Sequence, residues 1–468
     1  GKNAADLQYK TLIGSQAGSF ASGSTASGAI AIGQFAGSGI NGLDSIAIGR
    51  HTMRYGPADG SDRNIAIGRA AMQGVDADRL VGDYNIAMGY QAARDIKNGS
   101  DNVAIGRNAM VVAASDTTDP ANNNIAIGIN AGYQISSDSN IFIGPSAGRY
   151  VTTSSLNIGI GTNACRGDST SKLTSTGRNV AIGYEAMAQG YTTARYNVAI
   201  GMDAMATGTT ASGNTAIGYA AMENAATTTE HNVAVGWYAG REAMGNHNTI
   251  VGSEAHRGVV GVSTGQQNVA IGRQALYAQT TSSYNVAVGY QAADSLTTGG
   301  SNVALGWKSL AVSSTGSQNV AIGYQSLLNA AKDGNTGVGY QVGYTNTQGE
   351  ENTFVGMQAG YSVASASALQ GSFNTFIGFK AAYSYVGGVD YGSNVAIGHQ
   401  TLMTGTNANR TVALGNSAGV SGTASTDNVL VGYGAGSYAN STGNTMIGNK
   451  AGFRTNGNYN TVVGYRAL

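Results

Sequence analysis

The sequence predicts an all-β protein, a parallel β-solenoid (β-roll) of about 26 short coils. A motif close to Asn-Val-Ala-Ile-Gly occurs 26 times in 468 residues, and its closing glycine recurs on average every 18 residues between Gly14 and Gly464. A fixed motif at so short a period is typical of stacked coils, none of which can bury its apolar face alone. The 71 glycines argue against helices, because each glycine in a helix interior costs about 1 kcal/mol relative to alanine. We expect residues 1–468 to form a single continuous solenoid that is a segment of a longer fibre.

Each repeat begins with an asparagine. When positions are numbered from the closing glycine, position −4 is Asn in 22 of the 26 repeats, and the exceptions are Lys10, Ala29, Ser45 and Thr411. Such asparagines stack coil over coil into a hydrogen-bonded ladder, as amides do in in-register strands, or they cap the turn before the strand. We favour the ladder.

Positions −3 to −1 are expected to form a strand. Position −3 is β-branched in every repeat and position −1 is always apolar, as in residues 103–105 and 180–182. Stiff side chains spaced two apart lie on one face of a strand, whereas a helix needs spacings of three and four. Because parallel in-register strands cannot be joined by simple hairpins, all the strands should run in one direction.

Position −2 points to the opposite face of the strand and is also never polar, since it is Ala in 16 repeats and otherwise Gly or a large apolar residue. Strands that are covered on both faces have such continuous apolar runs. We expect Ile105 and Ile182, both at position −1, to point into the thin interior of the coil. The other face then needs a cover from outside, and an identical chain is the simplest one. This predicts a parallel homotrimer.

The glycine and the residues after it describe a corner. Glycine fits a position that needs positive φ or a close backbone approach, and Ala at position +3 in 21 repeats is small enough for a tight bend. Positions +1 and +2 vary and should face water. Two clear copies of the structural repeat are Asn102, Val103, Ile105, Gly106 and Ala109, and Asn179, Val180, Ile182, Gly183 and Ala186.

Composition argues against several classes of function. Charged residues make up 11% of the chain and the formal net charge is zero, so we expect no nucleic-acid partner. No stretch approaches 18 consecutive apolar residues, so we expect no membrane insertion in this segment. Cys165, the single cysteine, is interpreted as a packing residue. We expect no metal site and no other cofactor, and we place the five scattered histidines on the surface: His51, His231, His247, His256 and His399.

Aromatic residues at position +1 are the candidate binding residues. In successive coils they would present a strip of rings along the outside of the solenoid. Either the rings shield the corner and stack on one another, or they form a platform for the sugar rings of a host-surface polysaccharide. The candidate surface-binding residues are Tyr90, Tyr184, Tyr219, Trp237, Tyr290, Trp307, Tyr324 and Tyr340, and Phe379, Tyr433 and Tyr465 also occupy position +1. The other candidate surfaces are the longest loops, which follow Gly106, Gly161 and Gly356.

Other motifs indicate less. Neighbouring carboxylates have the chemistry for glycan cleavage, but acidic residues in loops are usually solvated, so we do not expect an enzyme. These carboxylates are Asp76, Asp78 and Asp83, and Glu350 and Glu351. We attribute to chance the tripeptide Arg166-Gly167-Asp168 and the Asn-x-Ser/Thr sequons at Asn98 and Asn440.

The pattern Asn-(Val/Ile)-Ala-Ile-Gly-x-x-Ala, as in residues 102–109, 179–186 and 268–275, resembles the head repeat of YadA-type trimeric autotransporter adhesins, which is also found in phage tail fibres. The resemblance implies a left-handed parallel β-roll, three chains wrapped around one axis, and binding to a host-surface glycan or protein. The regular heads of that family use a shorter, stricter repeat, and no coiled-coil stalk or membrane anchor is present here. We therefore expect an extracellular structural shaft or adhesion fibre, and a phage tail fibre ahead of a bacterial cell-surface adhesin or a polysaccharide-degrading tailspike.

Overall fold

The computed structural model describes sixteen segments of the chain. Every described segment is made of short strands, turns and loops, without a helix. The contacts group the chain into two units, Gly1–Val235 and Gly236–Leu468. The described residues are 10–19, 27–38, 43–54, 62–74, 82–96, 99–112, 121–167, 177–189, 193–208, 210–224, 229–243, 245–363, 371–385, 392–404, 408–421 and 426–467.

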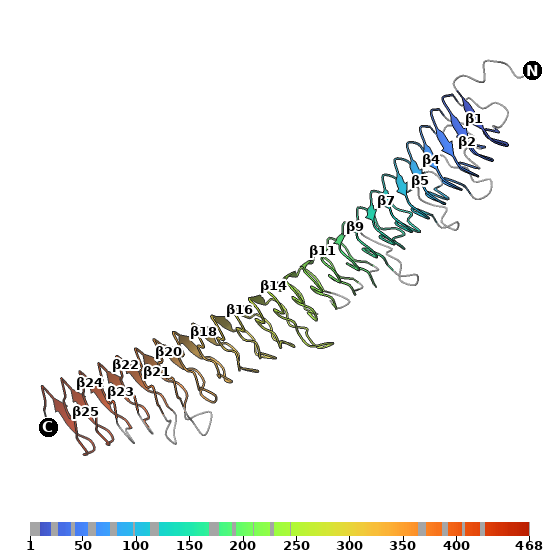
Figure 1. The fold of residues 1–468 in the computed structure, drawn as a ribbon. Coiled ribbons are helices and arrows are strands. Elements are labelled where there is room, and N and C mark those ends of the chain that lie inside the picture. Colours follow the sequence, from blue (N-terminus) through green and yellow to red (C-terminus); the bar gives the residue numbers. More distant parts are fainter. Residues whose placement is uncertain are drawn as a thin grey trace, which may run out of the picture. The chain divides into compact units, whose positions relative to one another are not determined.

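Both units are parallel β-solenoids, and each strand covers positions −3 to −1 of one repeat, as predicted (Figure 1). The first unit contains β1 (Thr11–Ile13), β2 (Ile30–Ile32), β3 (Ile46–Ile48), β4 (Ile65–Ile67), β5 (Ile86–Met88), β6 (Val103–Ile105), β7 (Ile125–Ile127), β8 (Ile141–Ile143), β9 (Ile158–Ile160), β10 (Val180–Ile182), β11 (Val198–Ile200), β12 (Thr215–Ile217) and β13 (Val233–Val235). The second unit contains β14 (Thr249–Val251), β15 (Val269–Ile271), β16 (Val286–Val288), β17 (Val303–Leu305), β18 (Val320–Ile322), β19 (Thr336–Val338), β20 (Thr353–Val355), β21 (Thr375–Ile377), β22 (Val395–Ile397), β23 (Val412–Leu414), β24 (Val429–Val431), β25 (Thr445–Ile447) and β26 (Thr461–Val463).

Within each unit, consecutive strands pair in parallel and in register. In β6 and β7, for example, Val103 lies opposite Ile125 and Ile105 lies opposite Ile127. Equivalent positions of the repeat therefore form straight columns that run from coil to coil. This arrangement confirms the prediction that all strands within a unit run in one direction.

The prediction of which strand face lies inside the coil is wrong. Ala104 at position −2 is completely buried, whereas Val103 and Ile105 on either side of it are only half-buried. The same pattern holds at Val180 and Ile182 in β10. The interior is so thin that it holds the small residue of position −2 together with positions +3 and +4. The larger β-branched side chains at −3 and −1 point outward.

Position −2 shares the interior volume with position +4. In coils such as those of Ala104 and Ala304 at position −2, a large side chain at position +4, Met110 or Leu310, fills the space and is completely buried. Where −2 is Phe142, position +4 is Gly148, and a Cβ on this glycine would overlap the phenyl ring. In these coils a large side chain at one position is matched by a small one at the other, as close packing requires.

The asparagine ladder is confirmed. The Oδ1 atom of Asn285 accepts hydrogen bonds from the backbone N–H of Asn302, at 2.9 Å, and from its Nδ2, at 3.1 Å. Asn285 donates in turn to the Oδ1 of Asn268 and, through Nδ2, to the carbonyl oxygens of Ser283 and Gly299. The Asn285 amide therefore links three coils and also holds its own turn, so the two alternatives foreseen for this residue operate together there.

A second polar column, which the sequence reasoning missed, lies at position −6. Here a short side chain accepts a hydrogen bond from the backbone N–H of position −6 in the preceding coil. Asp83 Oδ1 accepts from Asp62 N at 2.7 Å, Ser100 Oγ accepts from Asp83 N at 3.0 Å, and Asp138 Oδ1 accepts from Asn122 N at 2.7 Å. The column mixes Asp, Ser and Asn, so no single residue type reveals it.

The corner after the strand brings the backbones of neighbouring coils together. Gly106 has φ 130°, and a Cβ on it would lie 2.5 Å from the carbonyl oxygen of Gly128 in the next coil. Glycine is therefore required by the approach of the next coil as well as by its dihedral angle. Three non-glycine residues of the same coil also have left-handed backbones, Asp101, Asn108 and Met110, with φ between 55° and 60°.

Replacing Asn285 with Ala should lower the free energy of unfolding by about 1–3 kcal/mol, because the buried N–H of Asn302 loses its acceptor. Amide hydrogen exchange should speed up most at Asn302. Ser283 is the matched control, since it accepts a comparable bond from Gln266 N at an exposed site. Equal losses for Asn285→Ala and Ser283→Ala would contradict the role assigned to the buried ladder.

Replacing Gly148 with Ala should destabilise the coil of β8 by about 1–3 kcal/mol through overpacking against Phe142. Phe142→Ala alone should cost about 3–5 kcal/mol through the cavity that it leaves. The double variant Phe142→Ala, Gly148→Met restores the combination of Ala104 and Met110 in the coil of β6 and should recover most of the loss in chemical denaturation. Gly261→Ala is the control, because Gly261 has φ 75° but no atom within 4 Å of an added Cβ. Additive losses in the double variant would show that the two positions do not share one volume.

Candidate functional surface

The position +1 aromatic residues lie at the corner that follows the strand, as expected. Tyr90, Tyr184, Trp237, Trp307, Tyr324 and Tyr340 are exposed, and Tyr219 and Tyr290 are half-buried. Their environments differ according to the residue that occupies position +1 in the neighbouring coils, so the eight candidates do not form one continuous strip.

Four of the candidates, Tyr290, Trp307, Tyr324 and Tyr340, stack on one another in the second unit, and we call these four residues the aromatic ladder. The ring centroids of consecutive members are 6.0, 4.7 and 5.1 Å apart, with interplanar angles of 13°, 6° and 8°. The Arg273 guanidinium lies over the Tyr290 ring, 5.7 Å from its centroid.

The other candidates have different neighbours. The guanidinium of Arg69 lies 5.6 Å from the centroid of the Tyr90 ring. The side chain of Tyr184 hydrogen-bonds to Glu185, which raises the pKa of the phenol. Trp237 packs against Tyr238, with centroids 4.3 Å apart at an angle of 60°.

The geometry of the aromatic ladder favours the interpretation that the rings shield the corner and stack on each other. Both faces of Trp307 and both faces of Tyr324 are covered by neighbouring rings, so a sugar ring has no access to them. What these side chains present to solvent is their edges, which carry the positive part of the ring quadrupole, and the tyrosine hydroxyls.

A glutamine column runs beside the aromatic ladder at position +2. Nε2 of Gln291 donates to Oε1 of Gln274 at 3.0 Å. In the same way Gln341 donates to Gln325 at 2.8 Å, and Gln358 donates to Gln341 at 3.3 Å. We call these five residues the glutamine ladder. The repeated Tyr-Gln dipeptide was the sequence signal for it, but the pairing of the amides becomes evident only once the coils are in register.

One cation and one anion adjoin these columns. Lys308 occupies position +2 between the two segments of the glutamine ladder, and its Nζ lies 4.9 Å from the centroid of the Trp307 ring. Glu254 precedes the ladder and accepts a hydrogen bond from Gln274 Nε2 at 2.8 Å. Farther along the chain, three tyrosines at position +5 form another stack, in which Tyr361 lies 5.1 Å from Tyr344 and 5.0 Å from Tyr383.

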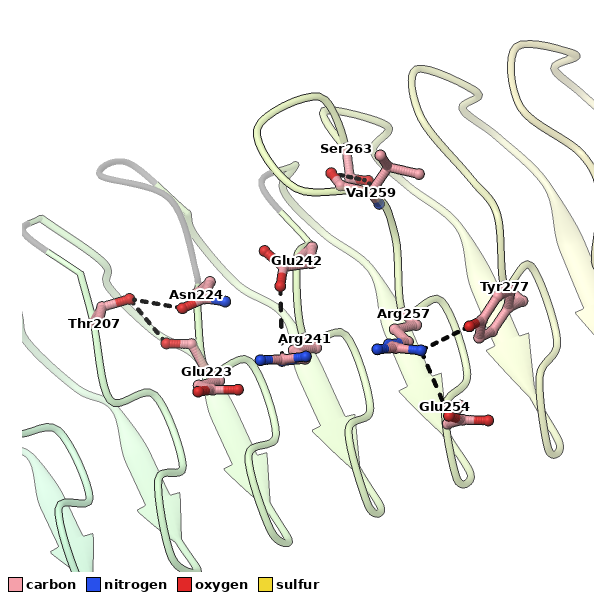
Figure 2. A network of polar contacts seen from close by, with 10 residues as sticks. All are labelled: Thr207, Glu223, Asn224, Arg241, Glu242, Glu254, Arg257, Val259, Ser263 and Tyr277. Carbon is pink, nitrogen blue, oxygen red and sulfur yellow. Dashed lines mark hydrogen bonds and ion pairs between the residues drawn. The ribbon is translucent and has the colours of Figure 1, made fainter.

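A polar network surrounds β14 (Figure 2). Arg257 Nη1 donates to the Tyr277 hydroxyl at 2.7 Å and lies 3.7 Å from a carboxylate oxygen of Glu254. Above it a loop carries Val260, which is 75% exposed, and Ser263 Oγ anchors this loop by accepting from Val259 N at 2.6 Å. The charged groups Arg257 and Glu254 pair with each other, and the bond between Ser263 and Val259 fixes the base of the loop.

The placement of His256 on the surface was wrong. This side chain occupies position +4, whose side chains point into the coil, and it is completely buried together with Ile250 at position −2. Its Nε2 hydrogen-bonds to Oε1 of Gln279, and its Nδ1 is buried without a partner. Burial lowers the pKa of His256 to about 4. No group of His, Cys, Asp and Glu among the described residues has the arrangement of a metal site.

The remaining candidates are structural or lie outside the described residues. Cys165 is completely buried, and burial raises the pKa of its thiol to about 12, in agreement with a packing role. Asp83 is engaged in the position −6 column. Glu351 is exposed beside the half-buried Glu350. Asp76, Asp78, Asn98 and Asp168 lie outside the described residues, as do parts of the three longest loops. The described segments contain no helix long and apolar enough to cross a membrane.

Stability should fall as the pH drops from about 6.5 to about 4. In this window the unfolded chain protonates His256 at its ordinary pKa of 6.5, whereas the folded chain keeps the imidazole neutral until about pH 4. The loss amounts to about 3 kcal/mol at full effect. His256→Gln should flatten this slope in urea denaturation series, while His399→Gln, at an exposed position, should leave it unchanged. An unaltered slope in His256→Gln would contradict the assignment.

Comparisons with known proteins leave the chain without an identified family. No protein-family model matches the sequence, and no curated protein matches it. The function must therefore be argued from the chain's own residues and geometry.

Proposed function

We propose that this chain is the shaft of a homotrimeric extracellular fibre that spans distance and contacts a host surface. The observation that carries this proposal is the outward face of the strands. Positions −3 and −1 present two columns of Val, Ile and Thr along each unit, which we call the apolar stripe. Its exposed members include Met88, Ile143, Ile217, Val233, Val251, Ile271, Ile397, Val429, Ile447 and Val463.

An apolar stripe of this length requires a cover. Monomeric soluble proteins rarely expose contiguous apolar patches larger than a few hundred Å². The stripe repeats with the period of the coils themselves, so the partner that matches it at every level is a second copy of the same chain in parallel. A closed ring of three copies buries all stripes around one axis and leaves no stripe exposed.

The remaining features suit a rigid spacer. Within each unit, neighbouring coils are tied by strand pairing, in most repeats also by the asparagine ladder, and in several coils by the position −6 column. Positions +1 and +2 and the loops stay at the surface and are the parts that vary. This combination supports a tail fibre of a phage, for which the head of a bacterial surface adhesin is the alternative. A polysaccharide-degrading tailspike is the further alternative, and a degradation assay separates it from a shaft.

Replacing Ile105 or Ile182 with Asp should disrupt the trimer and leave the individual coils folded, since both side chains point outward. Sedimentation equilibrium should show a shift from trimer to monomer, and circular dichroism should retain its β signal. Gln91→Asp and Gln291→Asp at position +2 are the controls and should leave the trimer intact. A stable, folded monomer of the unaltered chain would overturn the proposal.

A further inference from the structure

The second unit carries two side-chain columns over six consecutive coils, β15 to β20, and all residues from 245 to 363 are described. The aromatic ladder occupies position +1 in the coils of β16 to β19. The glutamine ladder occupies position +2 in five of the six coils, with Lys308 between its two segments in the coil of β17. Elsewhere in the described residues, position +1 mixes aromatic, charged and small side chains.

The glutamine ladder fixes hydrogen-bonding groups in a row. A primary amide has two N–H donors and two acceptor lone pairs, and each contact along the ladder uses one of each. The ladder contacts therefore leave one N–H donor and one lone pair of an internal member such as Gln341 unused. Because the amides are half-buried and already ordered by one another, little rotamer entropy remains to be lost on binding.

The aromatic ladder determines how a ligand can lie. The ring faces of Trp307 and Tyr324 are covered, so a sugar cannot stack on them in the usual way. The ring edges attract oxygen atoms, and the tyrosine hydroxyls donate and accept hydrogen bonds. A ligand rich in hydroxyl groups suits this surface better than an aromatic or purely apolar one.

The spacing selects an extended ligand. The two columns repeat with the coil, about every 4.8 Å. One sugar unit in an extended β-linked chain advances by nearly the same length, so a glycan parallel to the solenoid axis meets a Tyr-Gln pair at the coils of β16, β18 and β19 and a glutamine alone at those of β15 and β20. Individually weak contacts then add over several coils.

We propose that coils β15 to β20 form a binding track for an extended, neutral, β-linked polysaccharide, with about one sugar unit on each coil. The glycan is held by the glutamine amides and tyrosine hydroxyls against ring edges, without stacking on ring faces. This inference rests on the proposed fibre function, because it names the surface and the ligand class through which the shaft contacts a host.

The test uses the intact trimer with hexamers of β-1,4-linked glucose and of β-1,4-linked N-acetylglucosamine in titration calorimetry. Affinity for at least one series should increase with each added unit from dimer to hexamer. The double variant Gln325→Met, Gln341→Met should weaken hexamer binding about ten-fold, because two hydrogen-bonding sites are lost while side-chain length is kept. Gln91→Met, at position +2 of the first unit, is the matched control and should bind as the unaltered chain does.

Variants of the two tryptophans distinguish this binding mode from stacking of sugars on ring faces. Trp307→Ala interrupts the aromatic ladder and should weaken binding, whereas Trp237→Ala lies outside the track and should not. Equal losses at both tryptophans, or no binding of either hexamer by a trimer that sedimentation shows to be intact, would overturn the track and leave the shaft standing. Dissociation of the trimer in the glutamine or Trp307 variants would also overturn the track, because it would show that the two ladders lie between chains.

Discussion

The small volume of the coil interior is the constraint on which the rest of the structure depends. A coil that closes around Ala at positions −2 and +3 has no room for a second layer of large side chains. The β-branched residues needed for a stable strand must then stand outside. The apolar stripe, and with it the proposed trimer, follows from this lack of interior space. So does the exchange of volume between positions −2 and +4.

Much of the fold could be predicted from the sequence because the same local pattern of residues occurs in 26 repeats. The strand bounds, the parallel register and the asparagine ladder all follow from a fixed phrase. The assignment of the two strand faces failed for a definite reason: a period of two separates the faces but does not say which is inside. Size was the better guide, since Ala104 fits the interior and Ile105 does not.

The candidate surface was less predictable. Which +1 aromatics stack depends on whether consecutive coils carry them, and this selects Tyr290, Trp307, Tyr324 and Tyr340 and leaves Tyr90 with an arginine. The glutamine ladder and the position −6 column arise from residues 16 to 22 positions apart that meet only after the coils close. His256 was misjudged because its position in the repeat was not considered: it occupies position +4, where the side chain points into the coil.

The in-register glycine corner has a consequence for how such a chain changes in length. Gly106 lies so close to Gly128 that an added Cβ would overlap its carbonyl oxygen, and the corner after the strand keeps the same length in every repeat, whereas the interval between one repeat and the next varies in length. A duplication or deletion that runs from the closing glycine of one repeat to that of the next therefore adds or removes a complete coil and leaves every column aligned. Because the repeats are nearly identical in sequence, the gain or loss of one repeat changes the length of the solenoid by one coil and requires no new fold.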